Sequence, residues 1–167
     1  MHYIKIQERL KSVKIKEVID ALEHFAPLPL QESFDNAGLQ VGLTEADISG
    51  ALLCLDVTER VVDEAVATRC NLIVSHHPLI FHPLKKITGE NEVQRAVAKA
   101  IVNGITILSL HTNMDNAQGG VNYKIADKMQ LSDVDFFTPT REVEDVLGGS
   151  GVIGTLSEPM AADEFVL

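Results

Sequence analysis

The sequence predicts an α/β fold, a three-layer α/β/α lobe with a mostly parallel sheet. Short apolar runs typical of strands alternate with longer segments whose apolar residues recur at helical spacing. The runs are apolar on both faces, which strands need when helices cover both sides of a sheet. The expected order is a helix, a strand, and then three strand-helix units.

The first helix and strand precede this alternation. Apolar residues keep helical spacing from Ile15 to Phe25. Pro27 and Pro29 then stop the helix, because proline lacks a backbone donor and clashes with the previous turn. Asp, Asn and Gly in the segment 33–38 favour a turn. The alternating residues Leu39 to Val41 follow as a short strand.

The first strand-helix unit begins with the nearly continuous apolar run from Ala51 to Val57. Thr58 is the expected N-cap of a helix that ends near Cys70, since a Thr side chain can accept a hydrogen bond from the backbone of the first turn. Leu72 to Val74 repeats the buried-strand pattern and starts the second unit.

Two further helices complete the pattern. Asn91 and Gln94 have the spacing of a capping box, which predicts a helix closed by Asn103-Gly104. The strand Ile105 to Leu110 starts the third unit. After two glycines, the residues from Val121 to Met129 are expected to form the last short helix.

The character of the sequence changes after Phe137. A Thr-Pro pair interrupts the chain, an acidic stretch follows at 142–145, and the glycine-rich segment 148–151 precedes a strand-like run. We therefore expect one α/β lobe over 14–137, and over 138–167 the start of a following domain or second lobe that is cut short.

The bulk composition narrows the function classes. The net charge is -10, from 24 acidic and 14 basic residues, so no basic stripe can neutralise a phosphate backbone and we expect no nucleic-acid partner. Neither a run of about 18 apolar residues nor a signal-like start is present, which predicts no membrane partner. Cys54 and Cys70 match neither a CxxC pair nor a disulfide-rich pattern. Together these features predict a cytoplasmic protein with reduced cysteines.

The strongest chemical signal is the segment Ser75-His76-His77-Pro78, directly after a predicted buried strand. Ligands in open α/β sheets gather at the carboxyl ends of parallel strands, so two imidazoles stand where a site is expected. Neighbouring residues on an ideal strand face opposite sides, which favours the two rings serving two different ions. A pair of ordinary surface histidines is the alternative.

A second polar cluster follows the strand that ends at Leu110. It holds His111 and Asp115, and imidazole with carboxylate suits zinc, iron, manganese or nickel better than calcium. Asp115 could instead cap the next helix, and His111 could be a hydrogen-bonded core residue. We favour a metal site, because four such residues at two adjacent strand ends are unusual by coincidence.

Three other segments have weaker functional signals. Asp35 could place a carboxylate near the same cleft, although a tight turn is the simpler interpretation of its segment. His82, Lys85 and Lys86 could bind an anion, although exposed lysines usually form a solvated surface. The segment 149–154 matches GxGxxG, but it follows no buried strand and opens no helix, so we reject a dinucleotide site.

The polar segments together resemble one protein family, the NGG-one-interacting-factor-three-like proteins, some of which carry the name GTP cyclohydrolase one type two. The blocks that carry the resemblance are, in chain order, 34–39 (FDNAGL), 75–78 (SHHP), 111–115 (HTNMD) and 119–122 (GGVN). The resemblance covers about Lys14 to Leu131. Family chains usually begin near Lys14, so residues 1–13 look like an N-terminal extension without chemistry.

The resemblance implies a mixed sheet whose first strand is antiparallel, two such lobes in a full-length subunit, and a homohexameric ring with dinuclear metal sites. By their place in the motifs, His76, His77 and Asp115 match metal ligands, and His111 lies beside them as a candidate catalytic residue. The family's remaining ligands, a histidine and a glutamate four residues apart, belong to a carboxyl-terminal lobe that we expect this chain to lack.

Two functions are compatible with these features. The first is a metal-dependent hydrolase with two divalent ions per complete site, in which the ions lower the pKa of a shared water, His111 moves a proton, and the small-molecule substrate could be a nucleotide. The second is a non-enzymatic metal-binding scaffold or interaction protein. With half of the ligand set missing, the 167-residue chain is expected to bind metal weakly.

Overall fold

The computed structural model describes residues 2–4, 12–138 and 140–165, so most of the expected extension 1–13 lies outside the described residues. Its largest sheet has five strands in the order β1-β3-β4-β5-β2. The three central strands are parallel, and each edge strand is antiparallel to its neighbour. In chain order the strands are β1 (His2–Ile4), β2 (Gly38–Val41), β3 (Ala51–Cys54), β4 (Leu72–Ser75) and β5 (Thr106–Ser109). The sheet is mixed, and the first strand expected from the sequence is antiparallel.

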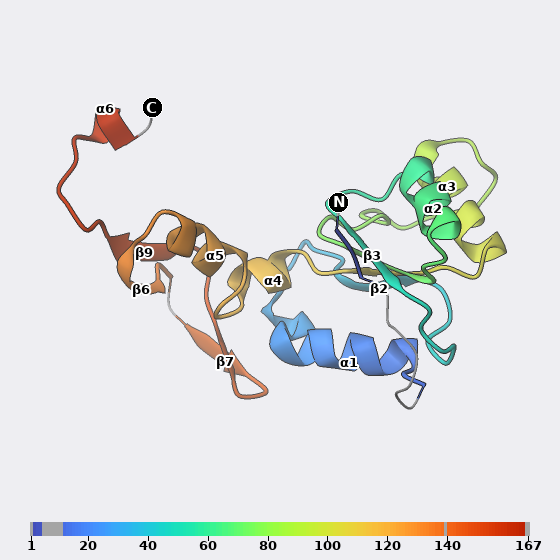
Figure 1. The fold of residues 1–167 in the computed structure, drawn as a ribbon, viewed down its shortest axis with the longest axis horizontal. Helices are drawn as coiled ribbons and strands as arrows, with labels where there is room; N and C mark the ends of the chain where they lie inside the picture. Colours follow the sequence, from blue (N-terminus) through green and yellow to red (C-terminus); the bar gives the residue numbers. More distant parts are fainter. Residues whose placement is uncertain (1, 5–11, 139, 166–167) are drawn as a thin grey trace.

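Helices cover both faces of this sheet (Figure 1). α1 (Ile15–Phe25) lies on one face, and α2 (Glu59–Ala67) and α3 (Glu92–Val102) lie side by side on the other. The predicted α/β/α layers and the alternation of strands with helices are confirmed, and α1 has the predicted bounds.

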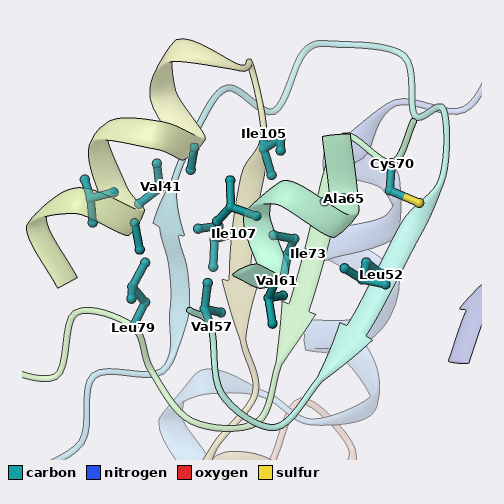
Figure 2. Packing of buried hydrophobic residues seen from close by; sticks show 14 residues of the cluster. Val41, Leu52, Val57, Val61, Ala65, Cys70, Ile73, Leu79, Ile105 and Ile107 are labelled. Carbon is teal, nitrogen blue, oxygen red and sulfur yellow. The ribbon is translucent and has the colours of Figure 1, made fainter. Parts of the chain in front are cut away.

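Alternating residues of the central strands supply two separate cores. Leu52, Ile73 and Ile107 share one register row and pack beneath α2 and α3 (Figure 2). Leu72 and Leu108 belong to the cluster on the opposite face, against α1. All five side chains have 0% relative exposure, so the sheet is apolar on both faces, as its strand sequences predict.

Two predicted helix N-caps are present, but in the second the Gln94 side chain does not bond back to the N-cap residue. Thr58 accepts a hydrogen bond from the first turn of α2, and Asn91 accepts one from the backbone of Gln94. The Gln94 side chain accepts instead from the backbones of Thr88 and Glu90, at 3.0 and 3.2 Å. The capping box is therefore half formed, and Gln94 ties the preceding loop to α3.

Two differences from the sequence prediction affect the site. β3 ends at Cys54 rather than Val57, because its last partner in the parallel ladder is Ser75, the final residue of β4. A short helix, α4 (Thr112–Asn116), stands between β5 and α5 (Val121–Lys128). Asp115 is therefore on a helical turn and not in a strand-end loop.

The segment after Phe137 contains a β-hairpin that the sequence does not predict. Its strands are β7 (Arg141–Val143) and β8 (Val146–Gly148), and the two residues between them, Glu144 and Asp145, both have positive φ, as tight hairpin turns require. Val143 and Val146 pack against a small cluster of buried residues next to η1 (Leu28–Leu30) and α4. The cluster consists of Ala26, Leu30 and Ala117. Contacts therefore cross the expected boundary at residue 138.

The remaining elements extend away from the large sheet. β6 (Ser132–Phe136) pairs antiparallel with β9 (Val152–Thr155), so a strand on each side of residue 138 forms this second small sheet. α6 (Ala162–Phe165) lies at the far end of the molecule from α2 and α3 (Figure 1).

The glycine-rich stretch before β9 has a packing role. A Cβ on Gly148 would meet Leu30 Cδ2 at 2.5 Å, and one on Gly149 would meet Phe136 Cγ at 2.8 Å. The Gly149 amide also donates to the carbonyl of Asn116 at 2.9 Å. The GxGxxG match leads into the strand β9 and not into a helix, as the sequence pattern predicts.

The two cysteines are not paired with each other, and no helix of the described ranges is suited to spanning a membrane. Cys54 is half-buried, Cys70 is buried, and both are free thiols. Burial, with smaller effects from Asp56 and Glu64, raises the pKa of the Cys54 thiol to about 11, so this thiol stays protonated at neutral pH. Within the described ranges, no helix combines the length and apolarity needed to span a bilayer.

Candidate metal centre

The candidate site lies at the carboxyl ends of β4 and β5. These strands are parallel neighbours, and their last residues, Ser75 and Ser109, are paired in register and joined by an Oγ–Oγ hydrogen bond of 2.8 Å. His76 and His77 follow Ser75 directly, and His111 comes shortly after Ser109. The pairing of the two strands therefore determines where both histidine loops begin.

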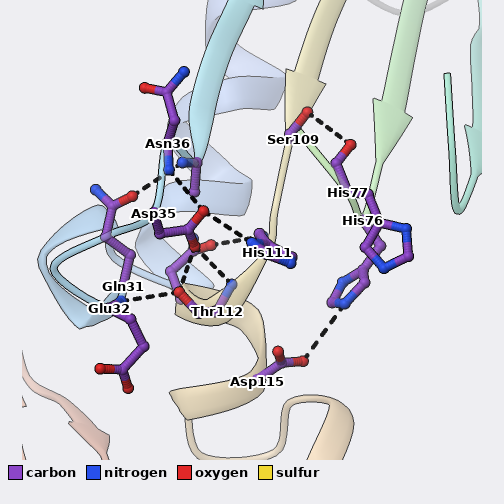
Figure 3. A network of polar contacts seen from close by, with 12 residues as sticks. Gln31, Glu32, Asp35, Asn36, His76, His77, Ser109, His111, Thr112 and Asp115 are labelled. Carbon is purple, nitrogen blue, oxygen red and sulfur yellow. Dashed lines mark hydrogen bonds and ion pairs between the residues drawn. The ribbon is translucent and has the colours of Figure 1, made fainter. Parts of the chain in front are cut away.

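Three imidazole rings meet at this edge of the sheet (Figure 3). The centroid of the His76 ring lies 4.9 Å from that of His77 and 5.2 Å from that of His111, and the other two centroids are 5.7 Å apart. One nitrogen of each ring lies within 4.8 Å of the others. The alternation of a strand does not separate the first two rings, because β4 ends before His76.

Asp115 reaches the same group of side chains from α4. Its Oδ1 lies 3.8 Å from Nε2 of His76, which is too long for a hydrogen bond. Two ligand atoms at about 2.0 to 2.2 Å from one ion are at most about 4.2 Å apart, so this separation is compatible with a shared ion. Asp115 does not cap the next helix, because Gly120 is the N-cap of α5.

Each ring presents its Nδ1 atom to an oxygen. The contacts are His76 to the carbonyl of Leu110 at 3.0 Å, His77 to Oδ1 of Asp56 at 2.8 Å, and His111 to Oδ1 of Asp35 at 2.8 Å. Carbonyl and carboxylate oxygens accept hydrogen bonds, so Nδ1 is the donor in each contact, and a neutral ring in this arrangement has its lone pair on Nε2. Metal-binding histidines commonly have this arrangement.

Asp35 is the most enclosed side chain of the group, with 0% of its surface exposed. It accepts hydrogen bonds from Nδ1 of His111, from the backbone amide and hydroxyl of Thr112, and from the backbone amide of Asn36 (Figure 3). Burial by itself would raise the pKa of Asp35, but the hydrogen bonds from Thr112, His111 and Asn36 outweigh it and hold the pKa below its ordinary value. The carboxylate is therefore ionised at neutral pH.

The structure brings together the four residues proposed from the sequence and adds two carboxylates to them. The sequence favours a turn at Asp35; a turn does precede it, and its carboxylate also contacts His111, 76 positions away. Asp56 is not predicted at all. It follows β3, whose carboxyl end lies at the same edge of the sheet as that of β4, so the strand-end rule applied to β3 would have identified it.

The basic residues after the double histidine stand apart from this group. His82, Lys85 and Lys86 are exposed, and Lys86 forms an ion pair with Glu90 at 2.7 Å. This arrangement matches the solvated surface that the sequence favours.

A family model supports the resemblance seen in the motifs. The model described as Duf34/NIF3 (NGG1p interacting factor 3) matches residues 13–167. The chain belongs to the Duf34/NIF3 family. The match begins close to Lys14, where the family-like part of the sequence was expected to start.

Individual Duf34/NIF3 relatives agree with this assignment. Two proteins named GTP cyclohydrolase 1 type 2 homolog are similar in sequence: that of Clostridium acetobutylicum is 41% identical over 111 residues, and that of Bacillus subtilis is 37% identical over 130 residues. They cover 66% and 78% of this chain, whereas the chain covers 41% and 35% of them. The chain thus spans roughly two fifths or less of the length of these relatives.

Solved structures show the same fold. A Bacillus cereus protein related to NIF3 superposes with a TM-score of 0.74 at 39% identity, over 79% of this chain and 36% of that protein. Reduced HcgD from Methanocaldococcus jannaschii superposes with a TM-score of 0.68 at 31% identity, over 75% of this chain and 50% of that one. The α/β lobe is therefore the Duf34/NIF3 fold.

Proposed function

We propose that this chain contributes His76, His77 and Asp115 to a dinuclear divalent-metal centre, and that the centre belongs to a hydrolase in which His111 carries a proton. The observation that carries the proposal is the common state of the three imidazoles. Each donates from Nδ1 to an oxygen, which in the neutral ring leaves the lone pair on Nε2, and one nitrogen of each lies within 4.8 Å of the others.

The donor set suits the proposed ions. Imidazole with carboxylate favours zinc, iron, manganese or nickel, and bound ions of this kind would lower the pKa of water and polarise a substrate oxygen. The Leu110 carbonyl and Asp56 hold the rings of His76 and His77 in place, which keeps their lone pairs available. The net charge of -10 favours the approach of cations.

His111 has a partner that suits it for proton transfer. Its Nδ1 donates to the ionised carboxylate of Asp35, so Nε2 can accept a proton from water or substrate. The buried carboxylate would stabilise the imidazolium formed in that step, as the carboxylate of a catalytic triad does. The names of the relatives, GTP cyclohydrolase 1 type 2 homologs, support a nucleotide as the substrate.

Further ligands and the assembly are a second part of the proposal. The chain covers 41% and 35% of two relatives. We propose that the part of those proteins that it does not match supplies the remaining metal ligands, and that the homohexamer also requires this part. Adding that part should increase the affinity for zinc, and light scattering during size-exclusion chromatography should then show a hexamer. A longer form that stays monomeric with unchanged affinity would contradict this part.

The first experiment measures metal binding directly. Zinc and manganese are titrated calorimetrically into the wild-type chain and into His77→Ala and Asp115→Asn, with His82→Ala as the matched control, because His82 is exposed and lies outside the three-ring group. We expect both site variants to bind zinc at least about tenfold more weakly and the control to match the wild type. Equal affinity for all four proteins would refute the site.

The second experiment separates an enzyme from a scaffold. Formate and phosphate release from GTP and simple esters is measured with the metal-loaded, longer form of the protein, with and without a chelator. Release that disappears with chelator and in His77→Ala supports the hydrolase. Tight metal binding without release supports the non-enzymatic scaffold.

A further inference from the structure

One turn of the chain holds both histidine loops. Asp35 contacts His111 and Thr112 in the loop after β5. The adjacent Asn36 donates from Nδ2 to the carbonyl of Ile80 at 2.6 Å, in the loop that follows His77 and Pro78. Gln40 accepts from the amide of the same residue at 3.1 Å. The segment 35–40 therefore connects the two loops that carry the three rings.

The contacts of Asp35 are of two kinds. Those from the backbones of Asn36 and Thr112 and from the Thr112 hydroxyl would stabilise the turn and the start of α4 whatever the protein does. The Thr112 hydroxyl has a single proton; it donates to Asp35 and accepts from the amide of Glu32 at 2.9 Å. The contact from His111 is different, because it selects between the two tautomers of a ring.

We propose that Asp35 is a positioning residue that holds His111 as the Nδ1–H tautomer, with Nε2 left as the proton acceptor. A buried, ionised carboxylate accepts strongly from Nδ1–H and repels the lone pair that the other tautomer would place there. Asp35 does not itself contact the reacting atoms. The role of Nε2 rests on the proposed function, whereas the tautomer does not.

The chain contains a matched comparison for this role. Asp56 contacts His77 with the same atoms and the same 2.8 Å distance, but 68% of the Asp56 side chain is exposed, against 0% for Asp35. Water can accept from Nδ1 of His77 in place of Asp56, so the tautomer of His77 should depend less on its aspartate. Thr112→Val provides the complementary comparison, because it removes a partner of Asp35 and leaves the contact with His111.

The test is the tautomer of His111, read by nitrogen-15 NMR of the histidine-labelled, metal-free chain at a pH where the ring is neutral. We expect the wild type to carry its proton on Nδ1. Asp35→Asn should raise the ratio of the Nε2–H to the Nδ1–H form at least about tenfold, and Asp56→Asn and Thr112→Val should leave the His111 ratio within about twofold. Thr112→Val should be less stable than the wild type. A general loosening of the turn predicts the same loss of stability, so the tautomer ratio is the measurement that separates the two explanations.

Two results would overturn the proposal. One is a wild-type His111 that carries its proton on Nε2, a measurement that needs no variant and holds even if Asp35→Asn fails to fold. The other is a shift in Thr112→Val as large as that in Asp35→Asn, which would show that the tautomer follows loosening of the turn.

In the metal-loaded protein, Asp35→Asn should lower kcat about a hundredfold with little change in KM. A wild type without hydrolytic activity would count against the proposed function and leave the tautomer result intact.

Discussion

Two aspartate-histidine pairs flank the candidate metal centre, and they differ in burial rather than in distance. Asp35 with His111 and Asp56 with His77 each join Oδ1 to Nδ1 at 2.8 Å. The side chains of the first pair expose 0% and 19% of their surface, whereas those of the second expose 68% and 49%. One contact geometry therefore occurs in two different environments.

Burial changes what each pair contributes. Water competes for both members of an exposed pair, so such pairs add little to stability. A buried carboxylate that satisfies several donors cannot be removed without leaving those donors unpaired in a low dielectric, which is costly. Asp35 should therefore matter to the fold and to His111, and Asp56 should matter mainly to the orientation of His77.

The largest expected effect is on stability. Asp35→Ala removes the acceptor shared by Nδ1 of His111 and by the amide and hydroxyl of Thr112, and because each unpaired buried donor costs about 1 to 3 kcal/mol, the free energy of unfolding should fall by about 3 kcal/mol. Urea denaturation monitored by circular dichroism measures this free energy of unfolding. A loss no larger than that of Asp56→Ala would show that burial does not distinguish the two pairs.

Metal affinity should reverse the order of the two aspartates. Asp56→Asn loosens the ring of a proposed ligand, His77, and should weaken zinc binding about tenfold. Asp35→Asn acts on His111, which we do not assign as a ligand, and should change the affinity by less than about threefold. Calorimetric titration of zinc into both variants measures these two affinities. A larger loss in Asp35→Asn would make His111 a metal ligand.

A smaller effect is expected in acid. The pKa of Asp35 is lower in the folded chain than in the unfolded one, so the stability from its ionised form is complete above the ordinary pKa of an aspartate and is lost as the pH falls through the folded-state value. The stability gap between wild type and Asp35→Asn should thus shrink as the pH falls below about pH 4. Urea midpoints in this acid range measure the gap, and a gap that widens there would contradict the sign.

The smallest effect is expected for the exposed pair. Asp56→Ala removes a contact that water can replace, so the free energy of unfolding should change by no more than about 0.5 kcal/mol. The same urea experiment measures this change. A loss of several kcal/mol would mean that the Asp56 contact is as strong as that of Asp35.

Much of the lobe could be predicted because burial is recorded in short-range patterns. The helical spacing of Ile15 to Phe25 and the apolar runs of the central strands state which faces are covered. The hairpin at 141–148 and the short helix α4 were not predicted. Each spans few residues, and both pack in the small cluster around Leu30, which local periodicity does not reveal.

The sequence by itself determined that His76, His77 and His111 follow the ends of two strands, and the strand-end rule placed them at one edge of the sheet. Only the tertiary structure decided what holds those rings. Asp35 lies 76 positions from His111, its local sequence specifies a turn, and its burial arises only when the turn packs against the loop after β5. The physical reason is that secondary-structure preferences act over a few residues, whereas the pairing and desolvation of a charged side chain depend on segments brought together by the fold.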